Sequence, residues 1–285
     1  MPVPETGRIA FMYNKRADSC WYTIEQEQRD VLAVLFADSP KSFLIDAVLQ
    51  GHMGEAVADR RTRPHVALLS IADVVVFGGD PAHPRADDLA GLVPPERGIL
   101  LTSEAWYDVI ERVHGDCIVA IRRYGFDDTS LDLGVLRVLA GNVPNGYSLE
   151  RMDLALATEI SSGPPNILPN HVRQFDSPED FTDRGIGFCM LHEGKIAAAA
   201  SSYAVCDEGI EVQIDTRLAH RQRGLGTVAS AALVAHVIES GLRAHWDAAN
   251  HVSARLATIL GYTPTGVYWA RARIADPPVP DEPAR

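Results

Sequence analysis

The sequence predicts an α/β protein in two parts, and three observations support this fold class. Helical and strand patterns alternate along the first half of the 285 residues. A turn-rich segment, Asn142-Val143-Pro144-Asn145-Gly146, then separates two periodic regions. In the second half a glycine-rich loop lies between an alternating strand and a helical run, an arrangement typical of α/β proteins that bind phosphates.

Composition limits the functional classes. The hydrophobic fraction of 46% is that of an ordinary globular protein, and the formal charge of −12 argues against nonspecific binding to nucleic acid or anionic membranes. The four cysteines are scattered, which fits a reducing cytosol rather than a disulfide framework or a zinc site. No apolar run approaches the roughly 20 residues of a membrane span, and the N-terminus lacks a signal peptide's apolar core. We therefore expect a cytoplasmic protein.

The first half contains no catalytic signature. The expected helices are Thr23 to Ala37, Phe43 to Asp59 and Glu104 to Val113; the expected strands are His65 to Phe77 and Cys117 to Tyr124, with a long loop between Gly78 and Gly98. We place an N-terminal α/β domain at residues 1–143, the functional domain at 144–275, and a disordered tail at 276–285, where four residues are prolines.

The second half contains more distinct patterns. The expected strands are Tyr147 to Met152, Gly187 to Leu191, Ile196 to Val205, Ile210 to Thr216, His245 to Asp247 and Gly266 to Ile274. The expected helices are Leu154 to Ile160, one beginning at Ser177-Pro178, one from Leu225 that ends at Gly241, and Ser253 to Ile259.

The loop Arg221-Gln222-Arg223-Gly224-Leu225-Gly226 is the most informative segment. Glycines allow the main chain to approach a ligand closely, because no Cβ intervenes. The following helix contributes its unpaired first-turn N–H groups and the positive end of its dipole. Two arginines add charge suited to a pyrophosphate. The loop therefore predicts binding of a phosphorylated cofactor.

Several segments at fixed separations carry a resemblance. They are Gly185 to Cys189, Ile210 to Thr216, Arg221 to Gly226, His245 to Ser253, Leu256-Ala257 and Leu260-Gly261-Tyr262. Together they resemble the GNAT superfamily of acetyl-CoA-dependent N-acetyltransferases, in particular the branch that contains the zwittermicin-resistance acetyltransferase. The resemblance covers Gly146 to Arg273 well and the first half only loosely. It implies a GNAT fold with a mixed, mostly antiparallel central sheet.

The resemblance also implies a site for acetyl-CoA. Backbone groups of Ile214, Asp215 and Thr216 would hold the pantetheine arm, with Asn250 and Ser253 on its other side. The pyrophosphate would be bound by loop residues, namely Arg221, Gln222, Arg223, Gly224, Leu225, Gly226 and Thr227.

Amine acetylation needs a base, because an alkyl ammonium titrates near 10 and is mostly protonated at neutral pH. Glu211, on the polar face of its strand, is our candidate; the alternative is a solvated or ion-paired strand residue. Many family members place a tyrosine acid after the leucine that follows the Asn-containing helix start, whereas here Leu256 is followed by Ala257. Ser253, a water, Tyr262 or Tyr268 are left as candidate acids.

Other side chains are expected to be structural. Trp246 is expected in the core, and Asp247 either orients a turn or contacts substrate. The ten histidines lack a metal-ligand spacing such as H-E-x-x-H, so no metal is expected.

Two other functions remain open. Gly224 to Ala229 fits the dinucleotide fingerprint G-x-G-x-x-A, but arginines separate it from its strand and too few residues follow for a complete doubly wound sheet. The missing tyrosine is also compatible with a degenerate acyl-CoA-binding sensor or scaffold. The N-terminal half shapes the acceptor cleft, forms an oligomer contact, or is a degenerate copy of the same fold. We expect a small-molecule amine as acceptor and no nucleic-acid or membrane partner, and a homodimer is left open.

Overall fold

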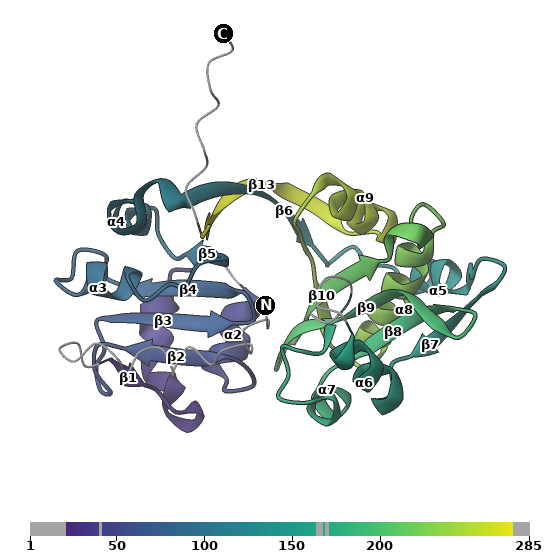
Figure 1. The fold of residues 1–285 in the computed structure, drawn as a ribbon, viewed down its shortest axis with the longest axis horizontal. Helices are drawn as coiled ribbons and strands as arrows, with labels where there is room; N and C mark the ends of the chain where they lie inside the picture. The colour runs from purple at the N-terminus through teal and green to yellow at the C-terminus, as the bar shows by residue number, and fades with distance from the viewer. Residues whose placement is uncertain (1–20, 40–41, 164–167, 169–170, 276–285) are drawn as a thin grey trace, which may run out of the picture. The chain divides into compact units, whose positions relative to one another are not determined.

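A computed structural model describes residues 21–39, 42–163, 168 and 171–275, so the predicted tail at 276–285 lies outside the described residues. The chain divides into two compact units, and two strands pass from one to the other (Figure 1). The C-terminal unit contains Arg123–Tyr268, and the N-terminal unit contains the preceding described residues together with those from Trp269 onward. These units divide at Arg122/Arg123, whereas the turn-rich segment Asn142 to Gly146 lies inside the C-terminal unit.

The N-terminal unit is built on five strands in the order β1-β2-β3-β4-β5. Neighbours are antiparallel except β4 and β5, which are parallel. The strands are β1 (Tyr22–Thr23), β2 (Glu55–Ala58), β3 (Val66–Ile71), β4 (Val74–Gly79) and β5 (Arg97–Leu101). The helices are the 3₁₀ helix η1 (Gln26–Phe36), α2 (Phe43–Leu49), α3 (Ala86–Ala90) and α4 (Ala105–His114), and a short 3₁₀ turn, η2 (Gly115–Cys117), precedes β6 (Ile118–Asp127).

The C-terminal unit repeats this arrangement in the order β7-β8-β9-β10-β11, with only β10 and β11 parallel. The strands are β7 (Tyr147–Arg151), β8 (Gly187–His192), β9 (Lys195–Cys206), β10 (Gly209–Thr216), β11 (Arg243–His245) and β12 (Asp247–Ala248). The helices are α5 (Leu133–Gly141), α6 (Leu154–Ser162), α7 (Pro178–Arg184), the turn η4 (Leu218–His220), α8 (Leu225–Glu239) and α9 (His251–Leu260), and β13 (Thr263–Arg273) closes the chain.

The two units therefore share one plan. In each, helical segments follow the first strand, three antiparallel strands come next, and a helix leads to a parallel strand, followed by another helix and a long strand. The long strands end in exchanged positions. Tyr124 and Gly125 of β6 pair with β12 in the C-terminal unit, while Arg271 to Arg273 of β13 pair with β5 in the N-terminal unit.

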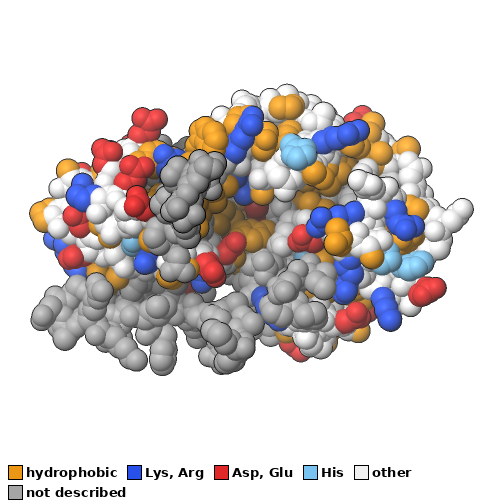
Figure 2. Space-filling model, turned by 45° about the horizontal axis from the view of Figure 1, so that its top comes forward, with side chains coloured by type: hydrophobic (Ala, Val, Ile, Leu, Met, Phe, Trp, Pro, Cys, Tyr) orange, Lys and Arg blue, Asp and Glu red, His pale blue; other side chains and the backbone are white. Residues whose placement is uncertain are grey.

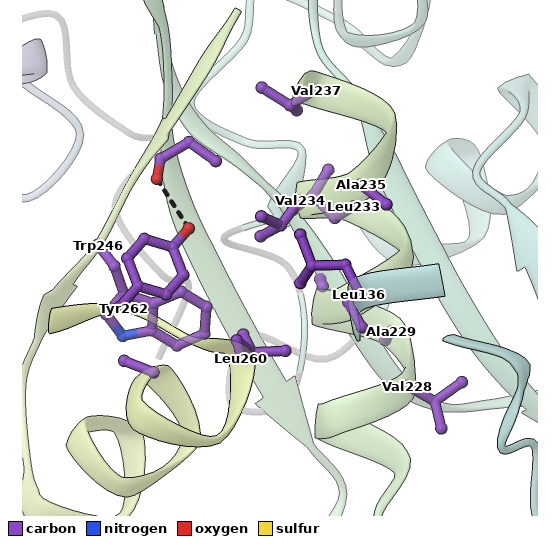
Figure 3. Packing of buried hydrophobic residues seen from close by; sticks show 14 of the residues in the cluster. Leu136, Val228, Ala229, Leu233, Val234, Ala235, Val237, Trp246, Leu260 and Tyr262 are labelled. Atoms are coloured by element: carbon purple, nitrogen blue, oxygen red, sulfur yellow. Dashed lines mark hydrogen bonds between the residues drawn. The ribbon is translucent and has the colours of Figure 1, made fainter. Parts of the chain in front are cut away.

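The core of the C-terminal unit forms around α8, which packs against β8, β9, β10 and α5. Most of α8 is buried, so its sequence is apolar on nearly every side rather than along one stripe. Figure 3 shows Val234 on the side of α8 that faces Trp246 and Tyr262, and Val228 on the other side of the helix; all four belong to one cluster of buried hydrophobic residues. Trp246 is 2% exposed, which confirms its predicted place in the core.

Two elements predicted in the first half were wrong. The helix expected from Phe43 to Asp59 ends at Leu49, and β2 follows a turn through Gly51 and Gly54, both at positive φ. The single strand expected from His65 to Phe77 is a hairpin, because the chain turns at Ala72, whose φ is +50°. That turn contains no glycine or proline, so the continuous apolar run concealed it. The loop expected between Gly78 and Gly98 contains α3, and α5 was not predicted.

None of the helices among the described residues is both long and apolar enough to cross a membrane.

Candidate functional site

The candidate site lies along β10, where this strand separates from β11. The two strands pair in parallel only from Gly209 to Glu211. Beyond β11 the chain turns away, and β12 pairs with β6 instead. A register shift at Glu211/Val212, a β-bulge against β9, marks the point of separation. Residues 212–216 of β10 therefore keep one neighbouring strand, β9, and present a free edge on the other side.

The hydrogen-bond pattern shows which main-chain groups face this edge. The amide of Arg217 donates to the carbonyl of Ala197 on β9, 2.9 Å away. Since antiparallel residues alternate between facing their partner and facing away, Asp215 also directs its main-chain groups to β9. Val212, Ile214 and Thr216 direct theirs to the free edge. The amide of Ser202, opposite Val212, donates to Ile186 instead, which agrees with this alternation.

A donor-rich loop follows the free edge. Gly224 has a φ of +78° and immediately precedes α8, whose first internal bond runs from the amide of Val228 to Gly224. The amides of Leu225, Gly226 and Thr227 come before that bond, and no described side chain caps them. Arg221, Gln222 and Arg223 are exposed beside them. The loop thus has the unpaired donors and the positive charge that a pyrophosphate requires.

The predicted strand and loop are brought together in the structure. A Cβ built on Gly226 would lie 3.6 Å from Thr216 Oγ1 and 3.7 Å from Ile214 Cδ1, so the first turn of α8 lies beside the free edge. Arg221 Nε donates to the carbonyl of Thr216 at 3.2 Å, which closes the loop onto the strand end. At the free edge, the amide and the carbonyl of Ile214 are both available to a ligand. The carbonyl of Thr216 already accepts the hydrogen bond from Arg221.

In the N-terminal unit, the strand that corresponds to β10 is β4, and its edge is covered by a neighbouring strand. Residues Val74 to Phe77 of β4 pair with β5 and also with β3, so they present no free edge. The connection after β4 begins with Asp80-Pro81 and contains no R-x-x-G-x-G sequence. The helix α3 has five residues, against fifteen in α8. Of the two units, only the C-terminal one has this open site in the described residues.

Glu211 lies at the start of the free edge and is 7% exposed. Its Oε2 atom is 2.6 Å from Nδ1 of His245, the last residue of β11. Burial works to lower the pKa of His245, but the charge and hydrogen bond of Glu211 outweigh it and raise the pKa from 6.5 to about 9. The imidazole is therefore protonated at neutral pH, and the two residues form a charged pair. His245 was not identified from the sequence, although the parallel register of β10 and β11 places it directly opposite Glu211.

This pair predicts a loss of stability at alkaline pH. A histidine whose pKa is raised on folding stabilises the protein fully below its unfolded pKa, and this contribution is lost as pH rises through the folded value. Between pH 6.5 and about 9 the free energy of unfolding should fall by roughly 3 kcal/mol. Urea unfolding across this range should show the decrease, and His245→Gln should flatten it. An unchanged slope in that variant would contradict the assignment.

Asn250 and Ser253 occupy the start of α9. Asn250 Oδ1 accepts from the amides of Val252 and Ser253, both at 3.0 Å, so it caps the helix and keeps only its amide group for a ligand. Ser253 Oγ accepts the indole N–H of Trp246 at 3.1 Å. The serine hydroxyl proton is directed elsewhere, which retains Ser253 as a candidate proton donor.

The two candidate tyrosines are already engaged. Tyr262 is 2% exposed and its hydroxyl donates to the carbonyl of Ala244 at 2.7 Å, the bond dashed in Figure 3. The Tyr268 hydroxyl donates to Asp247, which also forms an ion pair with Arg123 at 2.7 Å. Burial and the Asp247 charge raise the pKa of Tyr268. Asp247 thus orients its surroundings, and neither phenol is poised to give up a proton.

One group in the N-terminal unit has metal-ligand atoms close together. Atoms of Asp59, His65 and His83 lie within 4.8 Å of one another. Asp59 Oδ1 already accepts the amide of His65 at 2.8 Å, and Oδ2 lies 3.2 Å from both Arg60 Nε and His65 Nδ1. A guanidinium against the carboxylate opposes a second cation. These contacts describe a hydrogen-bonded strand end, and the expectation of no metal stays a prediction.

The surface charge is mixed on the face drawn in Figure 2. There, among the described residues, Lys and Arg side chains lie interspersed with Asp, Glu and hydrophobic ones.

Two mixed, mostly antiparallel sheets, with an uncapped helix start beside a free strand edge, define a protein of the GNAT fold. A family model described as GNAT acetyltransferase matches residues 33–270, which takes in both units. The chain therefore belongs to the GNAT acetyltransferase family.

Individual proteins similar to this chain are also described as GNAT proteins or N-acetyltransferases. A crystal structure of a GCN5-related N-acetyltransferase-like protein from Streptococcus suis shares 30% identity and a TM-score of 0.78, over 86% of this chain and 98% of that one. An uncharacterized N-acetyltransferase of Bacillus subtilis (strain 168), YdfB, is 26% identical over 166 residues; the match spans 56% of this chain and 60% of that relative's length. A tandem GNAT protein from the clavulanic acid biosynthesis pathway, with 15% identity and a TM-score of 0.52, covers 88% of this chain and shares the fold alone.

Proposed function

We propose that this protein transfers the acetyl group of acetyl-CoA to a primary amine of a small molecule. The observation that carries the proposal is the free edge of β10 beside the uncapped start of α8. These features fit the two parts of coenzyme A: outward-facing amides and carbonyls for the pantetheine arm, and loop donors with arginine charge for the pyrophosphate. Family membership supports the same cosubstrate.

Residues at the start of the edge would carry the chemistry. When bound, acetyl-CoA supplies a thioester whose acetyl carbon accepts the amine. Glu211 would take a proton from the substrate ammonium, directly or through one water, and the neutral amine would then attack, forming the C–N bond as the C–S bond breaks. The outward-facing amide of Val212 would donate to the carbonyl oxygen as charge develops on it, and the amide of Ile214 would face the pantetheine arm. His245 would hold the Glu211 carboxylate in place.

Ala257 stands where many family members have a tyrosine acid, but catalysis does not depend on that tyrosine. A thiol ionises near 8.5, so a thiolate leaves readily at neutral pH with little help from an acid. Ser253, whose oxygen is fixed by Trp246, would protonate the departing sulfur when protonation is needed. An enzyme is therefore favoured over a sensor or scaffold that only binds acyl-CoA.

We assign the chain to the branch with the zwittermicin-resistance acetyltransferase, with an amine-bearing antibiotic or metabolite as acceptor, in the cytoplasm and without nucleic-acid, membrane or metal partners. The shared strand plan supports a duplicated fold in which the N-terminal unit is the degenerate copy. A homodimer is compatible with this assignment.

Steady thiol release from acetyl-CoA in the presence of an amine panel tests the activity. We expect turnover with at least one small amine, and a thermal shift with acetyl-CoA that NAD does not reproduce. A shift with acetyl-CoA but no turnover across the panel would favour the sensor. A shift with NAD alone would overturn the site assignment.

A further inference from the structure

A second polar cluster lies on the other face of β10. The side chains of Ile210, Val212 and Ile214 pack against the core with α8. By alternation, Glu211, Gln213 and Asp215 project from the opposite face of the sheet. Glu211 is used by the proposed chemistry, whereas the Gln213 and Asp215 side chains are not. The polar face of β10 thus carries Glu211 at one end and the unused Gln213 and Asp215 side chains farther along.

The loop at residues 171–175 supplies the rest of this cluster. His171 is fully buried, and its Nδ1 lies 2.7 Å from Ser201 Oγ on β9. Its Nε2 lies 3.3 Å from Asp215 Oδ2 but makes no hydrogen bond there. The Asp215 side chain is 48% exposed. A fully buried imidazole therefore lies next to a carboxylate that is open to solvent.

Two amides extend the cluster from this carboxylate. Gln213 Nε2 donates to Asp215 Oδ2 at 3.4 Å, and Gln213 Oε1 accepts from Gln174 Nε2 at 3.1 Å. Gln174 Oε1 is buried and lacks a hydrogen-bond partner among the described residues. A buried amide oxygen without a donor is costly, and an ammonium group bound at this cluster would supply one. The unused groups here are acceptors, namely Gln174 Oε1 and the open side of the Asp215 carboxylate.

Position along the strand separates this cluster from the reacting centre. Asp215 is four residues beyond Glu211, which is about 13 Å along a strand. One alkyl amine cannot contact both carboxylates. The reacting nitrogen must also be neutral when it attacks, whereas a carboxylate with an amide oxygen prefers an ammonium.

We propose that Asp215, with Gln174 and Gln213, binds a second, non-reacting ammonium group of the acceptor, so that the preferred substrate is a small molecule with at least two amines. This inference rests on the proposed function, because it names the substrate class of the same site. The negative charge of the chain, −12, favours the approach of such a dication. Asp215 is a specificity-determining residue in this assignment.

The test compares α,ω-diaminoalkanes of three to twelve carbons with n-alkyl monoamines of equal length. For the wild type, kcat/KM should be about 10–100-fold higher for the best diamine than for its matched monoamine, as expected of a charge-assisted hydrogen bond. In Asp215→Asn the ratio should fall close to one. A change in acetyl-CoA binding caused by the substitution would affect the diamine and the monoamine equally, so it does not alter the ratio of their kcat/KM values. Asp183→Asn, an exposed carboxylate on α7, should keep the wild-type ratio.

A charge reversal and a binding measurement complete the design. Asp215→Lys should prefer an ω-amino acid to a diamine, which reverses the wild-type order. Calorimetry with 1,6-diaminohexane and CoA-saturated protein tests the cluster without turnover. If the wild type binds 1,6-diaminohexane, Asp215→Asn does not, and no amine is acetylated, the ammonium site is supported and the proposed function is refuted. Acetylation of amines with a ratio near one, or an equal ratio in Asp215→Asn, would refute the cluster and retain the function.

Discussion

Glu211→Gln should lower kcat by about 10²–10⁴-fold, the range for loss of a positioned base. Glutamine keeps the size of the side chain and a hydrogen bond to His245, but it cannot accept a proton from the substrate ammonium. The affinity for acetyl-CoA should change much less, because the main-chain groups at the edge and the loop amides are unaltered. Single-turnover kinetics and calorimetry with acetyl-CoA separate the two effects.

The pH profile provides the sharper readout for Glu211. A base that must be deprotonated gives the wild type a lower limb in log kcat against pH, and this limb should disappear in Glu211→Gln. Glu193→Gln, on the exposed turn between β8 and β9, is the matched control and should keep the wild-type rate. Turnover that is unchanged in Glu211→Gln across pH would remove this residue from the mechanism.

Gly226→Val should weaken acetyl-CoA binding about 100-fold or more. The added Cβ itself would lie at ordinary contact distance from Thr216 and Ile214. The branched side chain would, however, occupy the space between the free edge and the start of α8, where the pyrophosphate needs the amides. Loss of two hydrogen bonds to a charged group accounts for this magnitude.

Calorimetry with acetyl-CoA measures the Gly226→Val effect, and thermal unfolding checks that the variant is folded. Gly141→Val is a suitable control, since it changes a glycine at the end of α5 where a Cβ would have nothing within 4 Å. This control should bind as the wild type does. Retained affinity in folded Gly226→Val would show that the loop does not hold the cofactor.

The sequence predicted the strand and the loop of the candidate site because the signals there are local. The arginines and glycines of Arg221 to Gly226 specify a loop that the chain can form with few long-range contacts. The alternation from Ile210 to Asp215 likewise assigned each side chain to a face, and the packing of Ile210, Val212 and Ile214 against one core agrees with it.

The remaining features depend on pairing between distant segments, which periodicity does not encode. His245 meets Glu211 only through the parallel register of β10 and β11. The engagement of Tyr262 by Ala244 and the approach of His171 to Asp215 arise from tertiary packing. In the first half, the hairpin turn at Ala72 contains no glycine or proline, and the strand plan common to both units has no shared motif that would reveal it.

The exchanged ends of β6 and β13 make the two halves of the chain interdependent. Ile99 of β5 is fully buried, and β5 has β13 as its outer neighbour. A truncation anywhere before Arg271 would strip that neighbour and leave an apolar strand ready to aggregate, far from the missing residues in sequence. Neither half would be self-sufficient as a separate fragment, whereas co-expressed halves could complement each other.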